Sequence, residues 1–399
     1  MTLGAAAVLS LIVLGAAAAP GDARVETVDA RLVAGRVEAV SADHVTVRAR
    51  DGAQRLDAAE VVEIVFAEPA DAWAEKGRRV LVTQAGDRIA VSQARLDGKT
   101  LRLTTRLLGD VTLRPADARA LYLPTPDQTP GDLDKLVAAL ELPPAAGDRL
   151  IVDRRGTRPL AVDGVLEAIG PEKITFRWKD ASRKIARADV RLIELATVAA
   201  PTTAPKGVLH ARDGSTLGFT RLALTKGKVT LASPALGPCT VAQGDLAAIR
   251  YASGNVVRLS ERKPDAVKEH GFFGTTFRHR LNRSVAGRPL RLGGRTYRTG
   301  LGLHSYCELL YQLDGQYAAF VATVGIDDAV RPHGDATLHF LGDGRPLTDP
   351  IPLTGKTDPR SVRLDLKGVD AFLIRVDFGT DGLGFADHVN LAGARLLKD

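Results

Sequence analysis

The chain repeats itself, and this internal duplication constrains the fold more than any other feature. Residues 35–66 align without a gap with residues 164–195, at an offset of 129. Residues 101–120 align more weakly with residues 229–248, at an offset of 128. The order is therefore A-B-A′-B′, in units of about 40 residues. A unit this short buries little apolar surface alone, but four or five short strands can curl into a small barrel, and neighbouring barrels can share an interface.

Each unit has the pattern of short antiparallel strands. Apolar residues alternate with polar ones, as in Val45-Thr46-Val47, and glycine or Asp-Gly turns separate the runs. Alternation at period two is typical of strands with one buried face. The pattern resembles that of small SH3-like or Sm-like β-barrels. This resemblance implies four small barrels, which we interpret as a duplicated scaffold.

A proline-rich segment separates the two copies. Pro126 and Pro130 precede Asp132, which we expect to cap a short helix from Leu133 to Leu142. We expect this helix to act as a spacer that covers a barrel. The sequence thus predicts a first barrel pair over 27–123, a linker with a short helix over 124–148 and a second barrel pair over 149–252.

The first residues are typical of a secretory signal. Residues 2–19 carry no charge and end in small residues before Pro20, although no Lys or Arg follows Met1. We therefore predict a signal peptide over 1–20 and an exported protein, whether periplasmic, at the cell surface or secreted. If it were not cleaved, the segment would be just long enough for a membrane anchor.

Charge and composition exclude several classes of function. The chain has 54 Lys and Arg against 47 Asp and Glu, and its formal net charge is +7. The cations are mostly arginines spread along the chain, and aromatic residues make up 5%. Neither feature favours nucleic-acid binding, whereas weak attraction to an anionic polysaccharide fits the charge. Two cysteines, Cys239 and Cys307, exclude a disulfide framework.

No motif of an enzyme stands out in the sequence. The chain has no Gly-x-Ser-x-Gly elbow, no His-Glu-x-x-His, no P-loop and no Cys-x-x-Cys. The duplicated units and the C-terminal region account for nearly all of the residues. We therefore predict a protein without catalytic activity.

The last third of the chain has a different texture and carries a series of spaced motifs. A Gly-x-x-Tyr-x-x-Gly-Leu-Gly-x-His segment starts at Gly294, and a Tyr-x-Leu-x-Gly-x-Tyr-x-x-Phe strand starts at Tyr311. A Val-Gly-x-Asp-Asp turn follows at Val324, and an Asp-His-x-Asn-x-Ala-x-Ala-x-Leu strand runs from Asp387 to Leu396. In these motifs the region resembles the NPCBM family of carbohydrate-binding modules.

The resemblance implies a β-sandwich of the jelly-roll type over residues 265–399. Alternating strands agree with it, among them 317–324, 372–378 and 390–397, as does a hairpin around Gly342-Asp343-Gly344. The predicted fold class is all-β, with tandem small β-barrel repeats followed by this sandwich.

The same resemblance points to residues for binding a sugar. Sugar sites combine planar hydrogen-bonding groups with an apolar face for the ring. The polar candidates are His304, Tyr306, Asp387, His388 and Asn390. Two alternatives stay open, because His304 could bond backbone between strands and Asp387-His388 could cap a turn. Leu391 stands where the family commonly has Trp, which weakens the sugar-binding interpretation.

Clustered carboxylates raise the question of a metal. Asp327, Asp328 and Asp335 surround one loop, and Ca²⁺ prefers six to eight oxygen ligands. The spacing is not that of an EF-hand. We therefore weigh a structural calcium at these three residues against an ordinary acidic turn, and we expect no required cofactor.

Two functions from different classes follow. The first is an exported, non-catalytic carbohydrate-binding protein whose partner is a glycan or cell-envelope polysaccharide, bound by the C-terminal sandwich. The alternative is an envelope scaffold that binds envelope proteins and has lost sugar binding. Neither involves nucleic acid, nor a membrane beyond the N-terminal signal or anchor.

Overall fold

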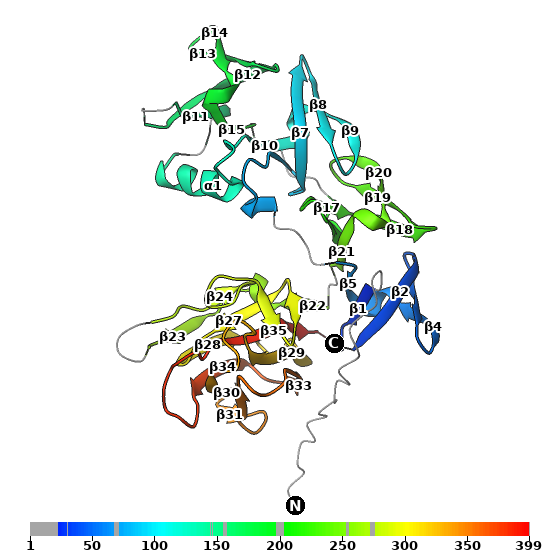
Figure 1. The fold of residues 1–399 in the computed structure, drawn as a ribbon, viewed down its shortest axis with the longest axis vertical. Helices are drawn as coiled ribbons and strands as arrows, with labels where there is room; N and C mark the ends of the chain where they lie inside the picture. The colour runs from blue at the N-terminus through cyan, green and yellow to red at the C-terminus, as the bar shows by residue number, and fades with distance from the viewer. Residues whose placement is uncertain are drawn as a thin grey trace, which may run out of the picture. The chain divides into compact units, whose positions relative to one another are not determined.

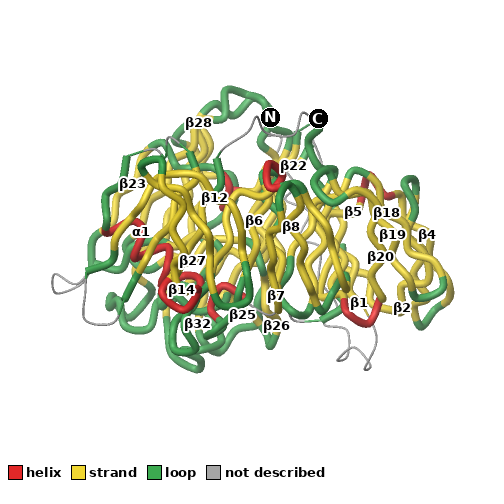
Figure 2. The backbone as a smooth tube through the Cα atoms, turned by 90° about the horizontal axis from the view of Figure 1, so that it is seen from above, coloured by secondary structure: helices red, strands yellow, loops and turns green. Residues whose placement is uncertain are grey.

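The computed structural model describes residues 23–29, 31–67, 72–143, 145, 147–154, 158–196, 203–252, 255–271 and 276–398. Strands dominate the backbone (yellow in Figure 2), and the predicted all-β fold is confirmed. The chain divides at about residue 252 into two compact units. The predicted signal peptide, 1–20, lies outside the described residues. Within the described ranges, no helix is long and apolar enough to cross a membrane.

The N-terminal unit holds the four repeats A, B, A′ and B′, and each repeat is an antiparallel set of five strands. The fifth strand returns to pair with the first, after a 3₁₀ turn that follows the fourth. In B′ the second strand is split in two. The strands of A are β1 (Ala23–Thr27), β2 (Leu32–Val40), β3 (His44–Ala49), β4 (Gly52–Asp57) and β5 (Val61–Val65); those of B are β6 (Val80–Thr83), β7 (Arg88–Asp97), β8 (Thr100–Thr105), β9 (Gly109–Leu113) and β10 (Ala118–Tyr122).

The copies follow the same plan (Figure 1). The strands of A′ are β11 (Asp148–Val152), β12 (Leu160–Ile169), β13 (Lys173–Trp178), β14 (Ala181–Ala186) and β15 (Val190–Glu194); those of B′ are β16 (Gly207–Ala211), β17 (Thr216–Phe219), β18 (Arg221–Thr225), β19 (Lys228–Ser233), β20 (Gly237–Ala242) and β21 (Leu246–Tyr251). The 3₁₀ turns before the fifth strands are η1 (Ala58–Glu60), η3 (Pro115–Asp117), η4 (Arg187–Asp189) and η5 (Gln243–Asp245).

The long second strand of each repeat bends at one recurring position. In β2, β7 and β12 the register shifts at Glu38, Ser92 and Glu167, where one extra residue has no opposite partner. The equivalent residue of B′ is Thr220, which separates β17 from β18. A bulge bends a strand and increases its twist. The bend lets one strand pair within its own repeat and also reach a neighbouring repeat.

Repeat A does not pair with the B repeat of its own copy. It pairs with B′, and A′ pairs with B. Ile64 of β5 lies opposite Ile249 of β21, and the equivalent Ile193 of β15 lies opposite Leu121 of β10. The ends of the second strands show the same partners, since β2 of A pairs with β18 of B′ and β12 of A′ pairs with β7 of B through equivalent residues. The two A–B-type pairs are therefore formed by exchange between the copies.

A contact between B and B′ joins the two exchanged pairs. Arg88 of β7 lies opposite Thr216 of β17, and these two residues are themselves equivalent at the offset of 128. The Gly218 N–H donates to Asp87 Oδ1 at 2.6 Å, and the Ala90 N–H donates to the equivalent acceptor, Ser215 Oγ, at 3.0 Å. The contact is thus self-complementary, as in a two-fold dimer.

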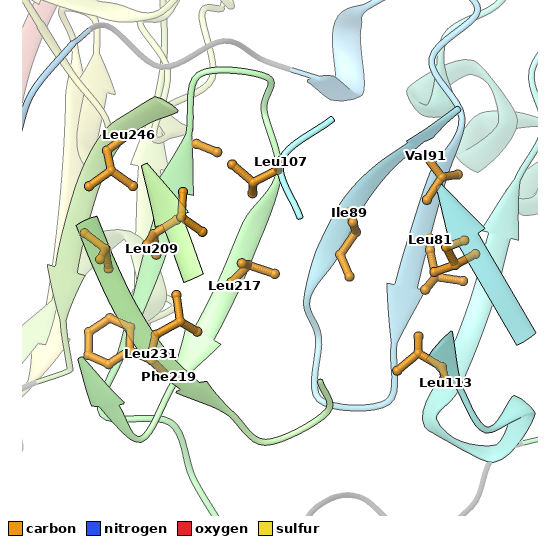
Figure 3. Packing of buried hydrophobic residues seen from close by; sticks show 14 of the residues in the cluster. Leu81, Ile89, Val91, Leu107, Leu113, Leu209, Leu217, Phe219, Leu231 and Leu246 are labelled. Carbon is orange, nitrogen blue, oxygen red and sulfur yellow. The ribbon is translucent and has the colours of Figure 1, made fainter. Parts of the chain in front are cut away.

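One hydrophobic cluster runs through all four repeats. It includes Leu81 and Ile89 of B and Leu209 and Leu217 of B′, all of which are fully buried (Figure 3). Five-stranded sets of about 45 residues bury little surface separately. The shared core is the reason that such short repeats are stable together.

The linker contains the predicted helix, displaced toward the N-terminus. α1 spans Pro130–Ala139, and its N-cap is Thr129, whose side chain accepts from the Asp132 N–H while the Asp132 carboxylate accepts from the Thr129 N–H. Asp132 is therefore the third residue of a capping box and not the cap itself. Apolar side chains of the helix pack near Ala120, Ile151 and Leu192, over the strands that join B to A′.

The C-terminal unit is a β-sandwich of two sheets with its core between them. Phe320 from one sheet meets Phe340 and Phe372 from the other, with ring centroids 5.2 and 5.1 Å apart. One sheet has the order β24 (Arg280–Leu281), β27 (Gly300–Leu303), β35 (Val389–Leu397), β29 (Ala319–Ile326), β33 (Arg360–Asp365), with β22 (Val256–Arg258) also on β35; the other has the order β23 (Ala266–Glu269), β28 (Cys307–Gln312), β34 (Ala371–Phe378), β30 (Asp335–Gly342), β31 (Arg345–Pro346), with β32 (Ile351–Thr354) also on β30. A hairpin, β25 (Leu290–Leu292) and β26 (Arg295–Tyr297), and a 3₁₀ turn, η6 (Leu259–Glu261), complete the unit.

Two expected boundaries move. The sandwich begins before residue 265, because β22 pairs with the last strand and Leu259 lies in the sandwich core. The first repeat likewise begins before residue 27, since β1 already pairs with β2 from Ala23. Both boundaries lie earlier in the chain than the sequence predicts, because strands of three to five residues are too short to show a clear alternation.

A glycine inside the bent strand β12, before its bulge, tests the packing of the repeats. A Cβ on Gly164 would lie 2.2 Å from the Arg177 carbonyl oxygen and 2.7 Å from the Phe176 ring. We expect Gly164→Ala to lower the stability of the N-terminal unit by about 1–3 kcal/mol, because the backbone must move to admit the methyl group. Calorimetry of the full chain measures this as a fall in the melting temperature of one transition.

Gly244→Ala is the matched control, because no atom lies within 4 Å of the Cβ that it adds. Equal melting temperatures for the two variants would contradict the close approach at Gly164.

Candidate functional site

Two of the five predicted site residues meet beside an aromatic ring. His304 follows β27 and His388 precedes β35, and pairing of these strands brings the imidazoles to a centroid distance of 5.6 Å. Phe277 stacks on His304 with centroids 4.3 Å apart and planes inclined by 23°, and its centroid is 6.2 Å from that of His388. We call these three residues the His-Phe cluster.

Contacts with backbone hold the His-Phe cluster in place. His304 Nδ1 lies 2.6 Å from the Ser305 carbonyl oxygen, so this nitrogen carries the proton. The His388 backbone is fixed by the Asp327 N–H, which donates to the His388 carbonyl oxygen at 2.8 Å. Close to Phe277, His279 is anchored by its Nδ1, 2.8 Å from Glu269 Oε1. Rigid surroundings of this kind preorganise a binding surface.

Both imidazoles of the cluster are neutral near pH 7. Burial lowers the pKa of His304 below its ordinary value, and the neighbouring His388 lowers it further. Burial also lowers the pKa of His388. A neutral imidazole offers one donor and one acceptor, which suits a hydroxyl group. His388 Nδ1 is buried and makes no hydrogen bond.

Asp387 has a structural role at the base of the cluster. Its carboxylate is fully buried and accepts from the Asp335 N–H at 2.9 Å and from the Ser305 hydroxyl. It therefore ties the segment after β27, the start of β30 and the start of β35 together. Burial raises the pKa of Asp387 to about 6.

Asn390 is also buried and lies on β35, between β27 and β29 in the interior of the sheet. Its amide nitrogen donates to Asp327 Oδ2 at 2.6 Å and to the Arg291 carbonyl oxygen at 3.3 Å. Asn390 Oδ1 has no hydrogen-bond partner. The side chain thus links β35 to the loop after β29 and does not reach the surface beside the imidazoles.

Tyr306 belongs to a separate aromatic group. Its ring stacks on His270 with centroids 4.5 Å apart, and Phe378 lies 6.3 Å from His270. The Tyr306 hydroxyl donates to Glu308, and burial with this carboxylate raises the pKa of Tyr306 to about 12. The structure therefore divides the five predicted residues among the cluster, its buried supports and this second group.

The three carboxylates predicted as calcium ligands have separate partners. Asp327 binds Asn390 and the Ala329 N–H, whereas Asp328 accepts from the Gly293 and Gly294 N–H groups at 2.8 and 2.7 Å. Asp335 accepts from the Thr380 hydroxyl at 2.6 Å. Within the part of the chain that the structure describes, no three His, Cys, Asp or Glu residues are placed to hold a metal ion. The structure therefore gives these three side chains separate protein partners and does not gather them around one point.

Leu391 lies in the hydrophobic core of the sandwich and is fully buried. It pairs with Val324 and Leu301 in the sheet. The residue at position 391 therefore affects packing, and the replacement of an aromatic residue there removes no ring from the exposed surface.

Sequence reasoning missed the aromatic residues of the site. Phe277 is 41% exposed and Phe385, in the loop before β35, is 68% exposed. Phe385 also contacts the His333 ring, with centroids 5.8 Å apart. Neither phenylalanine lies in a strand with alternating apolar residues, and this alternation is the signal by which the sequence reveals aromatic positions. Exposed large apolar side chains mark binding surfaces when they gather with polar groups.

Comparison with known families identifies the C-terminal region of the chain. Residues 256–397 match the family model described as the NPCBM/NEW2 domain. The C-terminal unit is therefore an NPCBM/NEW2 domain, and the resemblance seen in the sequence motifs is confirmed.

A curated relative matches part of the chain. It is a protein of Renibacterium salmoninarum named "Putative endo-alpha-N-acetylgalactosaminidase", 35% identical over 107 residues. The match covers 26% of this chain and only 7% of that relative. The matched region thus spans only a small part of the length of that relative.

The chain is also similar to solved structures of carbohydrate-binding modules, among them the following two. The CBM51 module from Clostridium perfringens GH95, solved in complex with methyl-galactose, is 25% identical, with a TM-score of 0.32, over 35% of this chain and 99% of the module. Tandem CBM51 modules of a family 98 glycoside hydrolase from Streptococcus pneumoniae are 12% identical, with a TM-score of 0.31, over 94% of this chain and 88% of theirs. At these TM-scores neither likeness bears on the ligand of this chain.

The buried carboxyl group of Asp387 predicts a pH-dependent stability. Its pKa is raised from 3.8 to about 6 by burial, so the folded state favours the protonated form. The stabilisation from this group is present below pH 3.8 and is lost as the pH rises through about 6. In Asp387→Asn the amide stays neutral and can still bond Asp335 N–H and the Ser305 hydroxyl. We expect the melting temperature of the variant to rise relative to the wild type between pH 4 and 7.

The exposed Asp349→Asn should show no such trend. Parallel curves for the wild type and Asp387→Asn across this range would contradict the assignment.

Proposed function

We propose that the protein is an exported, non-catalytic carbohydrate-binding protein, and that its C-terminal sandwich binds a glycan at the His-Phe cluster. The observation that supports this most is the half-exposed Phe277 ring stacked on His304 beside His388. A sugar ring offers an apolar face to an aromatic side chain and hydroxyl groups at its edge. The cluster offers one surface for each, which is the composition of a sugar site.

The charges at the cluster favour a neutral sugar. His304 and His388 are uncharged near pH 7 because burial lowers their pKa values. The Asp387 carboxylate is enclosed by its two donors and is turned away from the surface. His304 is 4% exposed and its Nδ1 is held by the Ser305 carbonyl oxygen, so the half-buried His388 is the imidazole for a sugar hydroxyl, with no charge to neutralise.

Export and the lack of catalysis belong to the same proposal. The apolar segment 2–19 supports export, and carbohydrate-binding modules commonly act outside the cell. The sequence holds no motif of a known catalytic machinery, and the family match covers a binding domain. The named glycosidase relative is matched over too little of its length to transfer its activity.

The alternative, an envelope scaffold that has lost sugar binding, rested on Leu391. Since Leu391 lies in the core, that residue no longer favours the alternative. The sugar-binding proposal therefore has the better support.

Substitution of Phe277 tests the proposed site. A glycan array probed with the full chain identifies a binding sugar, and titration calorimetry then measures its affinity. We expect Phe277→Ala to weaken binding about tenfold, equivalent to about 1.4 kcal/mol, because the ring face is lost. A Phe277→Trp variant should retain binding.

Val267→Ala serves as the control, because Val267 is similarly exposed, at 44%, but lies on β23 outside the cluster. The proposal fails if the wild type binds no glycan on the array, or if Phe277→Ala and Val267→Ala bind equally well.

A further inference from the structure

The N-terminal unit contains a groove of about 940 Å³ between repeats B and A′. Its walls include the apolar residues Leu123, Pro124, Pro126, Pro171 and Val190. Four arginines also line it, Arg79, Arg95, Arg187 and Arg191. Its volume is at the upper end of those of small-molecule sites, which suits an extended ligand.

Three of these arginines lack an acidic partner. Arg191 faces Asp153 at 3.6 Å, and the Asp189 carboxylate of the groove is held by Arg154 at 2.9 Å. In the described part of the chain, no ion pair joins Arg79, Arg95 or Arg187 to a carboxylate. Glu172 is the further carboxylate of the lining, so the groove keeps a cationic excess.

Arg187 lies deepest among the unpaired arginines. Its Nη1 donates to the Ala94 and Gly170 carbonyl oxygens at 3.0 and 3.1 Å, while its Nη2 has no hydrogen-bond partner. Burial lowers its pKa, as do the like charges of Arg79 and Arg95 nearby. Such a concentration of cations is unfavourable unless an anion relieves it.

The duplication provides an internal comparison for these arginines. The pairing of A with B′ uses residues equivalent to those that pair A′ with B. At the four arginine positions, the A–B′ pair carries Gly207, Ala223, Ala58 and Val62. The A–B′ pair has an arginine, Arg221, at the position equivalent to Gln93 of the groove lining. The A–B′ pair thus forms without this cluster, so joining of the repeats does not require the arginines.

We propose that the groove between B and A′ binds an acidic oligosaccharide, whose carboxylates are held by Arg79, Arg95 and Arg187. Guanidinium groups match carboxylates in planar, bidentate pairs. The choice of a sugar polymer rests on the function proposed for the C-terminal unit.

The strand pairing disfavours a peptide in the groove. β7 is paired with β6 and β8, β10 with β6 and β15, and β15 with β10 and β11. An extended peptide commonly binds by adding a strand to a free sheet edge. These strands have occupied edges, so recognition in the groove must come from side chains.

Binding of an oligogalacturonate tests the proposal, measured by titration calorimetry with the full chain at low and moderate salt. We expect Arg95→Ala to weaken binding about tenfold, because one charged hydrogen-bonding group for the ligand carboxylates is lost. Arg95→Ala/Arg187→Ala, which installs the residue types of the A–B′ pair, should weaken it further. The carboxyl-reduced, neutral form of the oligosaccharide should not bind in the groove.

The matched control is Arg36→Ala/Arg221→Ala, which removes the same charge from exposed sites on the A and B′ repeats. Melting temperatures check that each variant is folded. The proposal is overturned if the acidic oligosaccharide does not bind, if the two double variants bind it equally, or if an oligoglutamate peptide binds in its place. Phe277→Ala should leave this binding unchanged, so a failure of the C-terminal sugar site and a failure of the groove are separate results.

Discussion

The exchanged pairing of repeats is the constraint on which the N-terminal unit depends. Each repeat is too small for a core of its own. Its fifth strand pairs with the first strand on one side, and its other edge has no partner within the repeat. Pairing of β5 with β21 and of β15 with β10 fills these edges and merges the cores. Because the two pairs are formed between copies and not within them, the chain closes on itself around a self-complementary contact between B and B′.

The duplication helps to distinguish two kinds of residue. Residues needed for the shared scaffold recur in both copies, whereas residues with a separate role in one copy do not. The bulge at Glu38 and Glu167 recurs in both A-type repeats, and each glutamate pairs with an equivalent arginine, at 2.5 Å from Arg48 and 3.3 Å from Arg177. Gly35 and Gly164 recur because a Cβ at either would meet a carbonyl oxygen. The arginines of the groove do not recur in the A–B′ pair, which supports a role for them other than joining the repeats. An unduplicated protein would not offer this comparison.

At the C-terminal site, the sequence motifs predicted some of the residues that meet but not their separate roles. The motif residues His304 and His388 meet because β27 and β35 pair, and the sequence motifs placed them at those strand ends. Asp387 and Asn390 belong to the same motif but are buried supports, which a motif cannot distinguish from contact residues. Phe277 comes from a segment without strand periodicity, so only the folded chain brings its ring to His304.

The sequence by itself determined the all-β class, the duplication, the linker helix and the NPCBM/NEW2 character of the last third, because these depend on local periodicity, repeated residues and spaced motifs. Only the tertiary structure decided which repeats pair, which carboxylates stay apart, and where Leu391 and Phe277 lie. Strand partners are chosen by long-range packing of merged cores. Residue spacing carries no information on that choice, whereas the pairing of β5 with β21 and of β15 with β10 shows it directly.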